Sequence, residues 1–135
     1  MKRVTADSNQ YISALLRGGK PLQLLELARS GQIELAVSDD ILNEVGRVLG
    51  DKFKVPTEDV EEYRNQVLGF AKHVTPAERL RVVTSDADDD KILECAVAAG
   101  SEIVVTGDAH LLALGNFSGI RIQRVAEFLA DFQAP

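Results

Sequence analysis

Short runs of β-branched and aliphatic residues alternate along the chain with longer stretches in which apolar residues recur every three or four positions. This alternation is typical of βαβ units, in which helices connect the parallel strands of one sheet. The runs with the length and composition of strands are residues 3–6, 32–37, 102–106 and 120–123, with a shorter one near 80–84. The pattern predicts an α/β fold on a mainly parallel sheet.

The helices are predicted from their periodicity and from the residues that begin or end them. Gly31 follows one helical run, and Ser38 precedes another, where its hydroxyl would accept a hydrogen bond from a free backbone N–H group. Asp39 and Asp40 in the first turn of that helix would oppose the positive end of its dipole. The predicted helices cover residues 9–17, 21–30, 38–49, 57–72, 89–99, 109–114 and 125–132.

Composition limits the chain to one domain of ordinary size. Its 135 residues are 45% hydrophobic and 27% charged, so a core can form, and this composition argues against disorder. Cys95 is the single cysteine and lies in an apolar helical run, which indicates a buried thiol in a reducing compartment. No signal peptide or membrane-spanning segment is visible, and we expect a cytoplasmic protein with no membrane partner.

The net charge argues against a nucleic-acid partner held by general electrostatic attraction. The chain carries 15 Lys and Arg residues against 21 Asp and Glu, a formal charge of -6. A protein of this charge repels a phosphate backbone overall. Any phosphate-bearing substrate therefore needs a local cationic site.

Acidic residues follow two of the predicted strands. Asp7 comes after residues 3–6, and Asp108 comes shortly after 102–106. If these strands are neighbours in a parallel sheet, both carboxylates meet at the edge where ligands bind in open α/β folds. The alternative is that each aspartate only caps the next helix.

Two further acidic features are candidates for the same edge. Residues 86–90, Asp-Ala-Asp-Asp-Asp, hold four carboxylates before an apolar helix, more than capping uses, and these would repel one another unless a cation is present. Glu44 lies beside the apolar stripe of the helix that Ser38 begins. The alternatives are a solvated turn for the acidic run and a surface position for Glu44.

The chemistry of these side chains points to a hard divalent cation. Mg²⁺ and Mn²⁺ prefer oxygen ligands and react with phosphates through the waters they keep. With one cysteine, and with His73 and His110 far apart in the sequence, the chain lacks the ligand spacing typical of a structural zinc site. Neither histidine nor Cys95 belongs to a nucleophile motif, so any chemistry must come from the metal.

Four sequence motifs resemble those of the PIN domain (PilT N-terminal) family, in particular the toxin component of bacterial and archaeal toxin-antitoxin systems. They are residues 4–9 with 12–16, residues 38–45, residues 86–91 with 92–96, and residues 105–108 with 111–112. Their order and spacing cover nearly the whole chain. The resemblance implies a single PIN-like domain over residues 1–135, a three-layer α/β/α sandwich with a central, mainly parallel sheet.

The resemblance also assigns roles to individual residues. It implies that the catalytic, metal-holding acids are Asp7, Glu44, Asp89 and Asp108, with Ser8, Asn9 and Thr106 as hydrogen-bonding support. Asp86 matches another acid of the third motif, and its contact with metal is left open. Two positions depart from the family: Gln10 stands where an aliphatic residue is usual, and His110 where many relatives carry a second Asp, which would weaken a second metal site.

By this resemblance the protein is a metal-dependent endoribonuclease that cleaves single-stranded RNA and is the toxin of a toxin-antitoxin pair. One or two Mg²⁺ or Mn²⁺ ions would supply the hydrolytic chemistry and leave a 5′ phosphate and a 3′ hydroxyl. Arg17, Lys20 and Lys91 lie near the motifs and are candidates for contact with the RNA backbone, although each also suits solvated surface. A small antitoxin that blocks the acidic cleft and a homodimer are the implied partners.

Three other functions compete with this interpretation. A receiver domain for phospho-signalling needs paired acids after the first strand and a lysine after a later one, whereas Asp7 is alone and no lysine follows Asp108. A haloacid-dehalogenase phosphatase needs Asp-x-Asp, which here reads Asp-Ser-Asn at residues 7–9. A catalytically inactive PIN-like binding module is the remaining alternative to the nuclease, and it would show no stabilisation by divalent ions.

Overall fold

A computed structural model describes residues 1–83 and 87–133. Its strands form one sheet in the order β3-β2-β1-β4-β6-β5. Every neighbouring pair runs parallel except β5 and β6, which confirms the mainly parallel sheet. The strands are β1 (Lys2–Ala6), β2 (Ile33–Val37), β3 (Lys72–His73), β4 (Ile103–Val105), β5 (Asn116–Phe117) and β6 (Ile120–Gln123).

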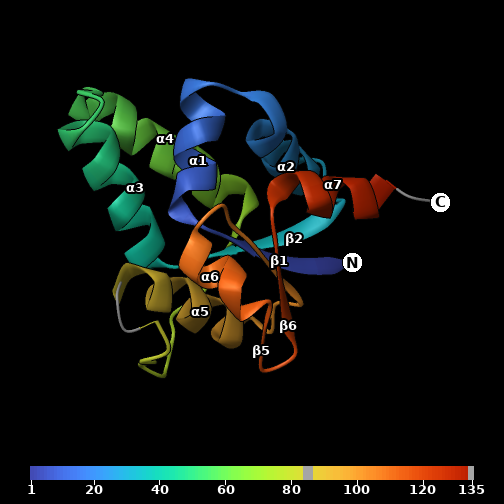
Figure 1. Cartoon of the computed structure of the whole chain (residues 1–135). Coiled ribbons are helices and arrows are strands. Elements are labelled where there is room, and N and C mark those ends of the chain that lie inside the picture. The colour runs from blue at the N-terminus through green and yellow to red at the C-terminus, as the bar shows by residue number, and fades with distance from the viewer. Residues whose placement is uncertain (84–86, 134–135) are drawn as a thin grey trace.

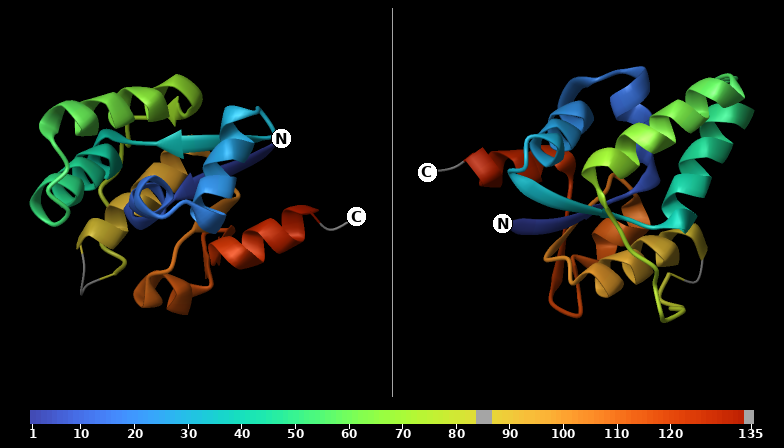
Figure 2. Two further views of the ribbon diagram at one scale, coloured as in Figure 1. Left: turned by 90° about the horizontal axis from the view of Figure 1, so that it is seen from above. Right: turned by 180° about the vertical axis from the view of Figure 1, so that it is seen from behind.

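Helices cover both faces of the sheet (Figures 1 and 2). They are α1 (Ser8–Leu16), α2 (Gly19–Arg29), α3 (Asp39–Asp51), α4 (Thr57–Phe70), α5 (Ala87–Ala99), α6 (Ala109–Leu114) and α7 (Val125–Gln133). α5 packs on β1, β2 and β4 from one side, while α1 and α2 lie on the other side, where α2 contacts β2. This arrangement confirms the α/β/α sandwich. None of the described helices has the length and apolar character that crossing a membrane requires.

The core lies between the central strands and the helices on either side. Val4, Leu35 and Val104 come from three adjacent strands and are fully buried. Leu24 of α2 and Leu93 of α5 are likewise buried. Each such side chain contributes about 1.5–3 kcal/mol by leaving water. This packing fixes the carboxyl ends of β1 and β4 side by side.

The predicted strand at 80–84 is wrong for its described part, residues 80–83, and residue 84 lies outside the described residues. Side chains of α5 take the place of a neighbouring strand. Glu94 Oε2 accepts the backbone N–H of Leu80 at 2.8 Å, and Asp90 Oδ1 accepts that of Val83 at 2.7 Å. Because carboxylates satisfy these donors, the segment is held against α5 without joining the sheet.

Two short strands differ from the predicted elements. The helix predicted over 57–72 ends at Phe70, because Lys72 and His73 pair with β2 as β3. β5 forms a hairpin with β6. The helix predicted from Asp89 begins two residues earlier, at Ala87.

Candidate metal centre

The first and last candidate acids lie at the same edge of the sheet. Asp7 follows β1 directly, and its backbone N–H donates to the carbonyl of Val105, the last residue of β4, at 2.9 Å. Asp108 lies three residues beyond the end of β4. β1 and β4 pair in parallel, which meets the condition left open by the sequence, and their carboxyl ends present both side chains on one side of the fold.

Asp7 is a buried carboxylate held by two hydrogen bonds. Its side chain is the N-cap of α1, with Oδ1 accepting the backbone N–H of Asn9 at 3.2 Å. Its Oδ2 accepts the hydroxyl of Thr106, a fully buried side chain, at 2.6 Å. Asp7 therefore caps a helix, and its orientation is fixed by β4 as well.

Asp108 caps α6 with one oxygen only. Its Oδ1 accepts the backbone N–H groups of His110 at 2.9 Å and Leu111 at 3.1 Å. Desolvation works to raise the pKa of Asp108, but the hydrogen bond from Leu111, a side-chain contact with Asp89 and the hydrogen bond and charge of His110 lower that pKa overall. Asp108 is therefore a stable carboxylate at this edge.

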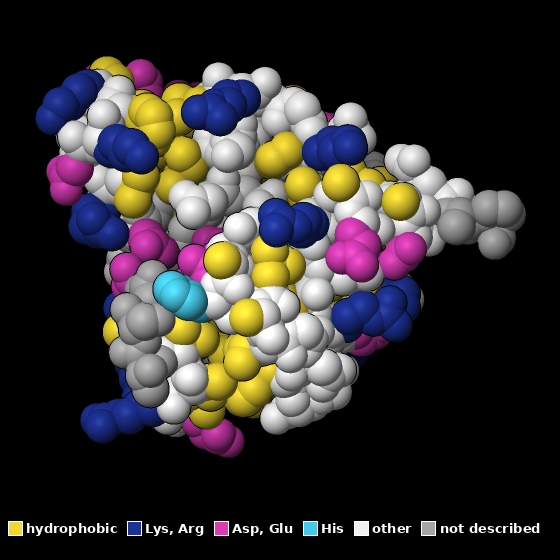
Figure 3. Space-filling view, in the orientation of Figure 1, with side chains coloured by type: hydrophobic (Ala, Val, Ile, Leu, Met, Phe, Trp, Pro, Cys, Tyr) yellow, Lys and Arg dark blue, Asp and Glu magenta, His cyan; other side chains and the backbone are white. Residues whose placement is uncertain are grey.

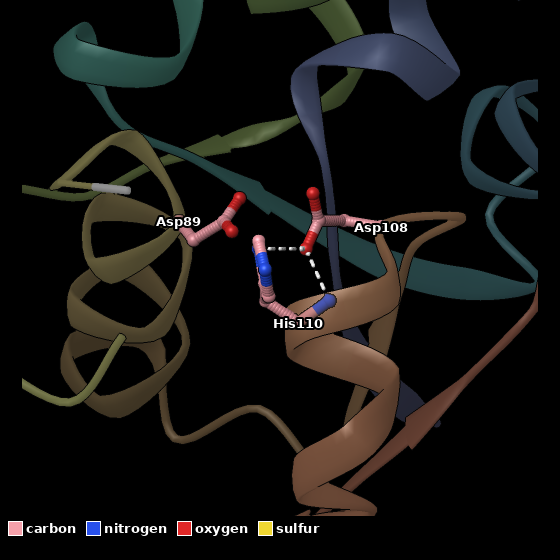
Figure 4. Close-up of side chains that lie close together, drawn as sticks. All are labelled: Asp89, Asp108 and His110. Atoms are coloured by element: carbon pink, nitrogen blue, oxygen red, sulfur yellow. Dashed lines mark hydrogen bonds and ion pairs between the residues drawn. The ribbon is translucent and has the colours of Figure 1, made fainter. Parts of the chain in front are cut away.

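Asp89 reaches this edge from α5, on the other side of the site. Asp89, Asp108 and His110 each offer one ligand atom, and these three atoms lie within 4.8 Å of one another. Figure 4 shows the imidazole rising between the two carboxylates. Two carboxylates so close repel each other, whereas a divalent cation between them would be stabilised by both. This donor set of two oxygens and one nitrogen fits a divalent metal ion.

Glu44 of α3 forms a second acidic group with its neighbours. Ser8 Oγ donates to Glu44 Oε2 at 2.5 Å, and Arg47 Nη2 lies 3.7 Å from Glu44 Oε1. Burial raises the pKa of Glu44, the Ser8 hydrogen bond opposes that rise, and the carboxylates of Asp88 and Asp7 add to it. Glu44 thus interacts electrostatically with Asp7, which links it to the β1 edge.

The acidic run before α5 divides among different neighbours. Asp89 faces Asp108, whereas Asp90 is buried against the segment that precedes the helix and accepts backbone N–H groups from it. Asp88 interacts with Glu44 and was not singled out from the sequence. Asp86 lies outside the described residues. The sequence indicated Asp88 only as a member of the acidic run. The direction of its side chain depends on where α5 begins.

The three basic candidates lie in different surroundings. Lys91 Nζ is 3.8 Å from Asp88 Oδ1, on the same helix as Asp89. Arg17 is the C-cap of α1 and lines a hollow of about 160 Å³ together with Asn9 and Lys52. Lys20 is exposed on α2. Figure 3 shows acidic side chains gathered beside a histidine, with Lys and Arg spread over the upper part of the same face.

Comparison with known proteins agrees with this geometry. The chain matches the PIN domain family over residues 3–110. It is similar to a chain in the VapBC2 structure from Rickettsia felis bound to a DNA fragment from their promoter, with 15% identity over 90% of this chain and 98% of that chain, and a TM-score of 0.66. PAE2754 from Pyrobaculum aerophilum is 21% identical over 100% of this chain and 91% of that chain, with a TM-score of 0.64.

At 15% and 21% sequence identity, the similarity to these two solved structures supports the fold alone. None of the curated proteins with which the chain was compared is significantly similar to it. The family match, in contrast, covers most of the chain and includes both strand ends that carry the acids. Since sequence motifs, strand order and family match all agree, the chain belongs to the PIN domain family.

Proposed function

We propose that this protein is a cytoplasmic, metal-dependent endoribonuclease that cleaves single-stranded RNA and acts as the toxin of a toxin-antitoxin pair. Its cofactor is Mg²⁺ or Mn²⁺. The residues that hold the metal are Asp7, Glu44, Asp89 and Asp108, supported by Ser8, Asn9 and Thr106.

The observation that carries this proposal is the approach of Asp89 to Asp108 from opposite sides of the same sheet edge. Folding brings the two carboxylates together with an imidazole, although like charges at this distance reduce stability. PIN domains are generally nucleases, and a hydrolase without a nucleophile motif needs such a cation site. Cys95 is fully buried and cannot reach a substrate.

In this proposal the side chains have separate tasks. A bound ion would supply an activated water and would stabilise negative charge on the phosphate and the leaving 3′ oxygen. Thr106 holds Asp7 in one orientation, and Ser8 does the same for Glu44. Asp108 is oriented by the first turn of α6. Such prepositioned carboxylates avoid the cost of ordering them when substrate binds.

The RNA backbone would contact basic residues around the acids. Arg17 and Lys52 line the same hollow as Asn9, and Arg47 Nη2 lies 3.7 Å from Glu44 Oε1, so α1 and α3 carry cations on the side of Glu44. Lys91 lies on α5 beside Asp88, and Lys20 is an exposed cation on α2. These cations provide the local attraction that an overall charge of -6 lacks.

The family and the similar solved structures support a proposal about partners. One similar chain comes from a VapBC2 complex bound to promoter DNA, and a small antitoxin is the corresponding partner for this chain. Exposed Leu15, Leu16 and Phe53 line a hollow of about 540 Å³ between α1 and α4, an apolar surface suited to a protein partner. We also propose a homodimer, which light scattering after size exclusion would test.

Cleavage of single-stranded RNA by the purified protein tests the enzymatic proposal. EDTA should abolish cleavage, and Mg²⁺ or Mn²⁺ should restore it. Asp7→Asn should lower the rate by at least about a hundredfold, the effect of removing one electrostatic group from a reacting centre. Cys95→Ala should leave the rate unchanged. Cleavage that persists in EDTA would exclude the metal mechanism, and no cleavage with either ion would favour the inactive binding module.

A further inference from the structure

We propose that His110 supplies a nitrogen ligand to the metal ion held by Asp89 and Asp108, and that this nitrogen makes the site prefer first-row transition ions over Mg²⁺. The proposal rests on the metal site of the proposed function. It goes further, because it makes His110 the residue that determines metal preference.

The distances support joint coordination. Ligand atoms about 2.0–2.2 Å from one ion lie at most about 4.4 Å apart. The three candidate atoms already lie within 4.8 Å of one another without any ion. A small rotation of an exposed side chain is enough to close the difference, and the His110 side chain has 60% of its surface exposed.

The imidazole of His110 is well positioned beside Asp108. The backbone N–H of His110 donates to Asp108 Oδ1, which anchors the residue in the first turn of α6. Its ring atom Nδ1 lies 4.0 Å from the same oxygen, longer than a hydrogen bond. Figure 4 shows the ring directed into the gap between the carboxylates. The ring is therefore placed for an ion shared with both aspartates.

The chemistry of the donors sets the expected preference. Mg²⁺ is a hard ion that takes oxygen ligands in near-ideal octahedral geometry, and an imidazole nitrogen is a poor substitute. First-row divalent ions accept imidazole, and their affinity for mixed sites rises from Mn²⁺ to Co²⁺ and Ni²⁺. A third carboxylate at position 110 would instead make an oxygen-only site that suits Mg²⁺.

Calorimetric titration of the protein with Mg²⁺, Mn²⁺ and Co²⁺ measures this preference. We expect His110→Asn to weaken Mn²⁺ and Co²⁺ binding by at least about tenfold and Mg²⁺ binding far less. His110→Asp should shift the preference towards Mg²⁺. The chain has two histidines, so His73→Asn is the matched control and should bind all three ions like wild type. His73 lies on β3 and contacts Asp39. Equal binding by wild type and His110→Asn would overturn the proposal.

Pulsed electron paramagnetic resonance of the Mn²⁺-loaded protein provides a direct test that needs no RNA. Wild type and His73→Asn should show ¹⁴N coupling from one imidazole, and His110→Asn should lose it. Mn²⁺ binding without ¹⁴N coupling would refute the role of His110 and leave the proposed nuclease intact. If no divalent ion binds to wild type, both this inference and the metal mechanism fail.

Discussion

Thr106 Oγ1 donates a hydrogen bond of 2.6 Å to Asp7 Oδ2, between residues that are 99 positions apart in the sequence. The same hydroxyl accepts the backbone N–H of Asp108 at 2.9 Å. One buried hydroxyl at the end of β4 thereby fixes the side chain of one candidate ligand and the backbone of another. The relative position of these two acids is a property of the β1–β4 pairing.

Replacing Thr106 with valine should therefore damage both stability and metal binding. The variant keeps the shape but removes the hydrogen bond to a buried carboxylate, which costs about 1.5–3 kcal/mol. Affinity for Mn²⁺ should fall by about 10- to 100-fold, as expected when the group that orients a ligand is lost. Denaturant unfolding and calorimetric titration measure the two effects.

Thr5→Val is the matched control for this variant. Thr5 is fully buried in β1 and its hydroxyl lies 2.8 Å from Ser101 Oγ, away from the candidate acids. The Thr5→Val variant should lose stability and keep the wild-type affinity for Mn²⁺. Thr106→Ser, which retains the hydroxyl, should restore most of the Mn²⁺ affinity. If Thr106→Val binds Mn²⁺ as tightly as Thr5→Val, Thr106 does not position the site.

The long elements of the fold could be predicted because each has a period of its own. The run at residues 32–37 became β2, and the amphipathic helix predicted over 38–49 became α3, which begins one residue later and ends two residues later. The two-residue strands β3 and β5 carry no such signal. β3 forms because it pairs with β2, and β5 forms because it pairs with β6. The residues within each two-residue strand give no information about this pairing.

Within the site, positions on strands could be predicted better than directions on a helix. Asp7 and Asp108 follow strands, and strand pairing alone placed them at one edge. Successive residues of a helix differ in direction by about 100°, so Asp88, Asp89 and Asp90 meet three different neighbours. Their assignment needs the starting point and packing of α5. The rotation of α5 about its own axis is set by tertiary packing, so it could not be derived from the acidic run.

A pair of tyrosines offers two substitutions of opposite effect. Tyr63 of α4 donates its hydroxyl to the backbone carbonyl of Tyr11 in α1 at 2.6 Å. The hydroxyl of Tyr11 is itself buried and has no hydrogen-bond partner among the described residues. Tyr63→Phe should lower the free energy of unfolding by about 1 kcal/mol. Tyr11→Phe should leave it unchanged or raise it, because an unsatisfied buried hydroxyl is removed. Equal losses in urea unfolding would contradict this assignment.

Cys95 should behave as an inert core residue. Burial raises the pKa of its thiol to about 11, so little reactive thiolate exists at neutral pH, and its side chain is fully buried. Labelling with iodoacetamide should occur only through unfolding and should accelerate in parallel with the unfolded fraction in urea. Labelling of the native protein as fast as a free thiol would show that α5 opens locally.

Glu44→Gln should stabilise the metal-free protein at neutral pH. Burial and the neighbouring carboxylates of Asp88 and Asp7 raise the pKa of Glu44 above its ordinary value of 4.5, so the folded state binds its proton more tightly than the unfolded state does. Stability linked to this group is present at low pH and is lost as pH rises from 4.5 through the raised pKa. Glutamine has no charge to desolvate and still accepts the hydroxyl of Ser8.

The stability difference between Glu44→Gln and wild type should therefore be small below pH 4.5, grow as pH rises through the raised pKa, and then stay constant. Glu44→Gln also removes an ion pair with Arg47, three residues later. Glu26→Gln is the control for this loss, because it removes an exposed glutamate that pairs with Arg29 at the same spacing. Saturating Mn²⁺ should reverse the order, because an ion bound to the native state stabilises wild type more than a variant that lacks a ligand. If wild type is more stable than Glu44→Gln without metal, the Glu44 carboxylate is not held against repulsion. If Mn²⁺ stabilises both proteins equally, Glu44 does not belong to the metal site.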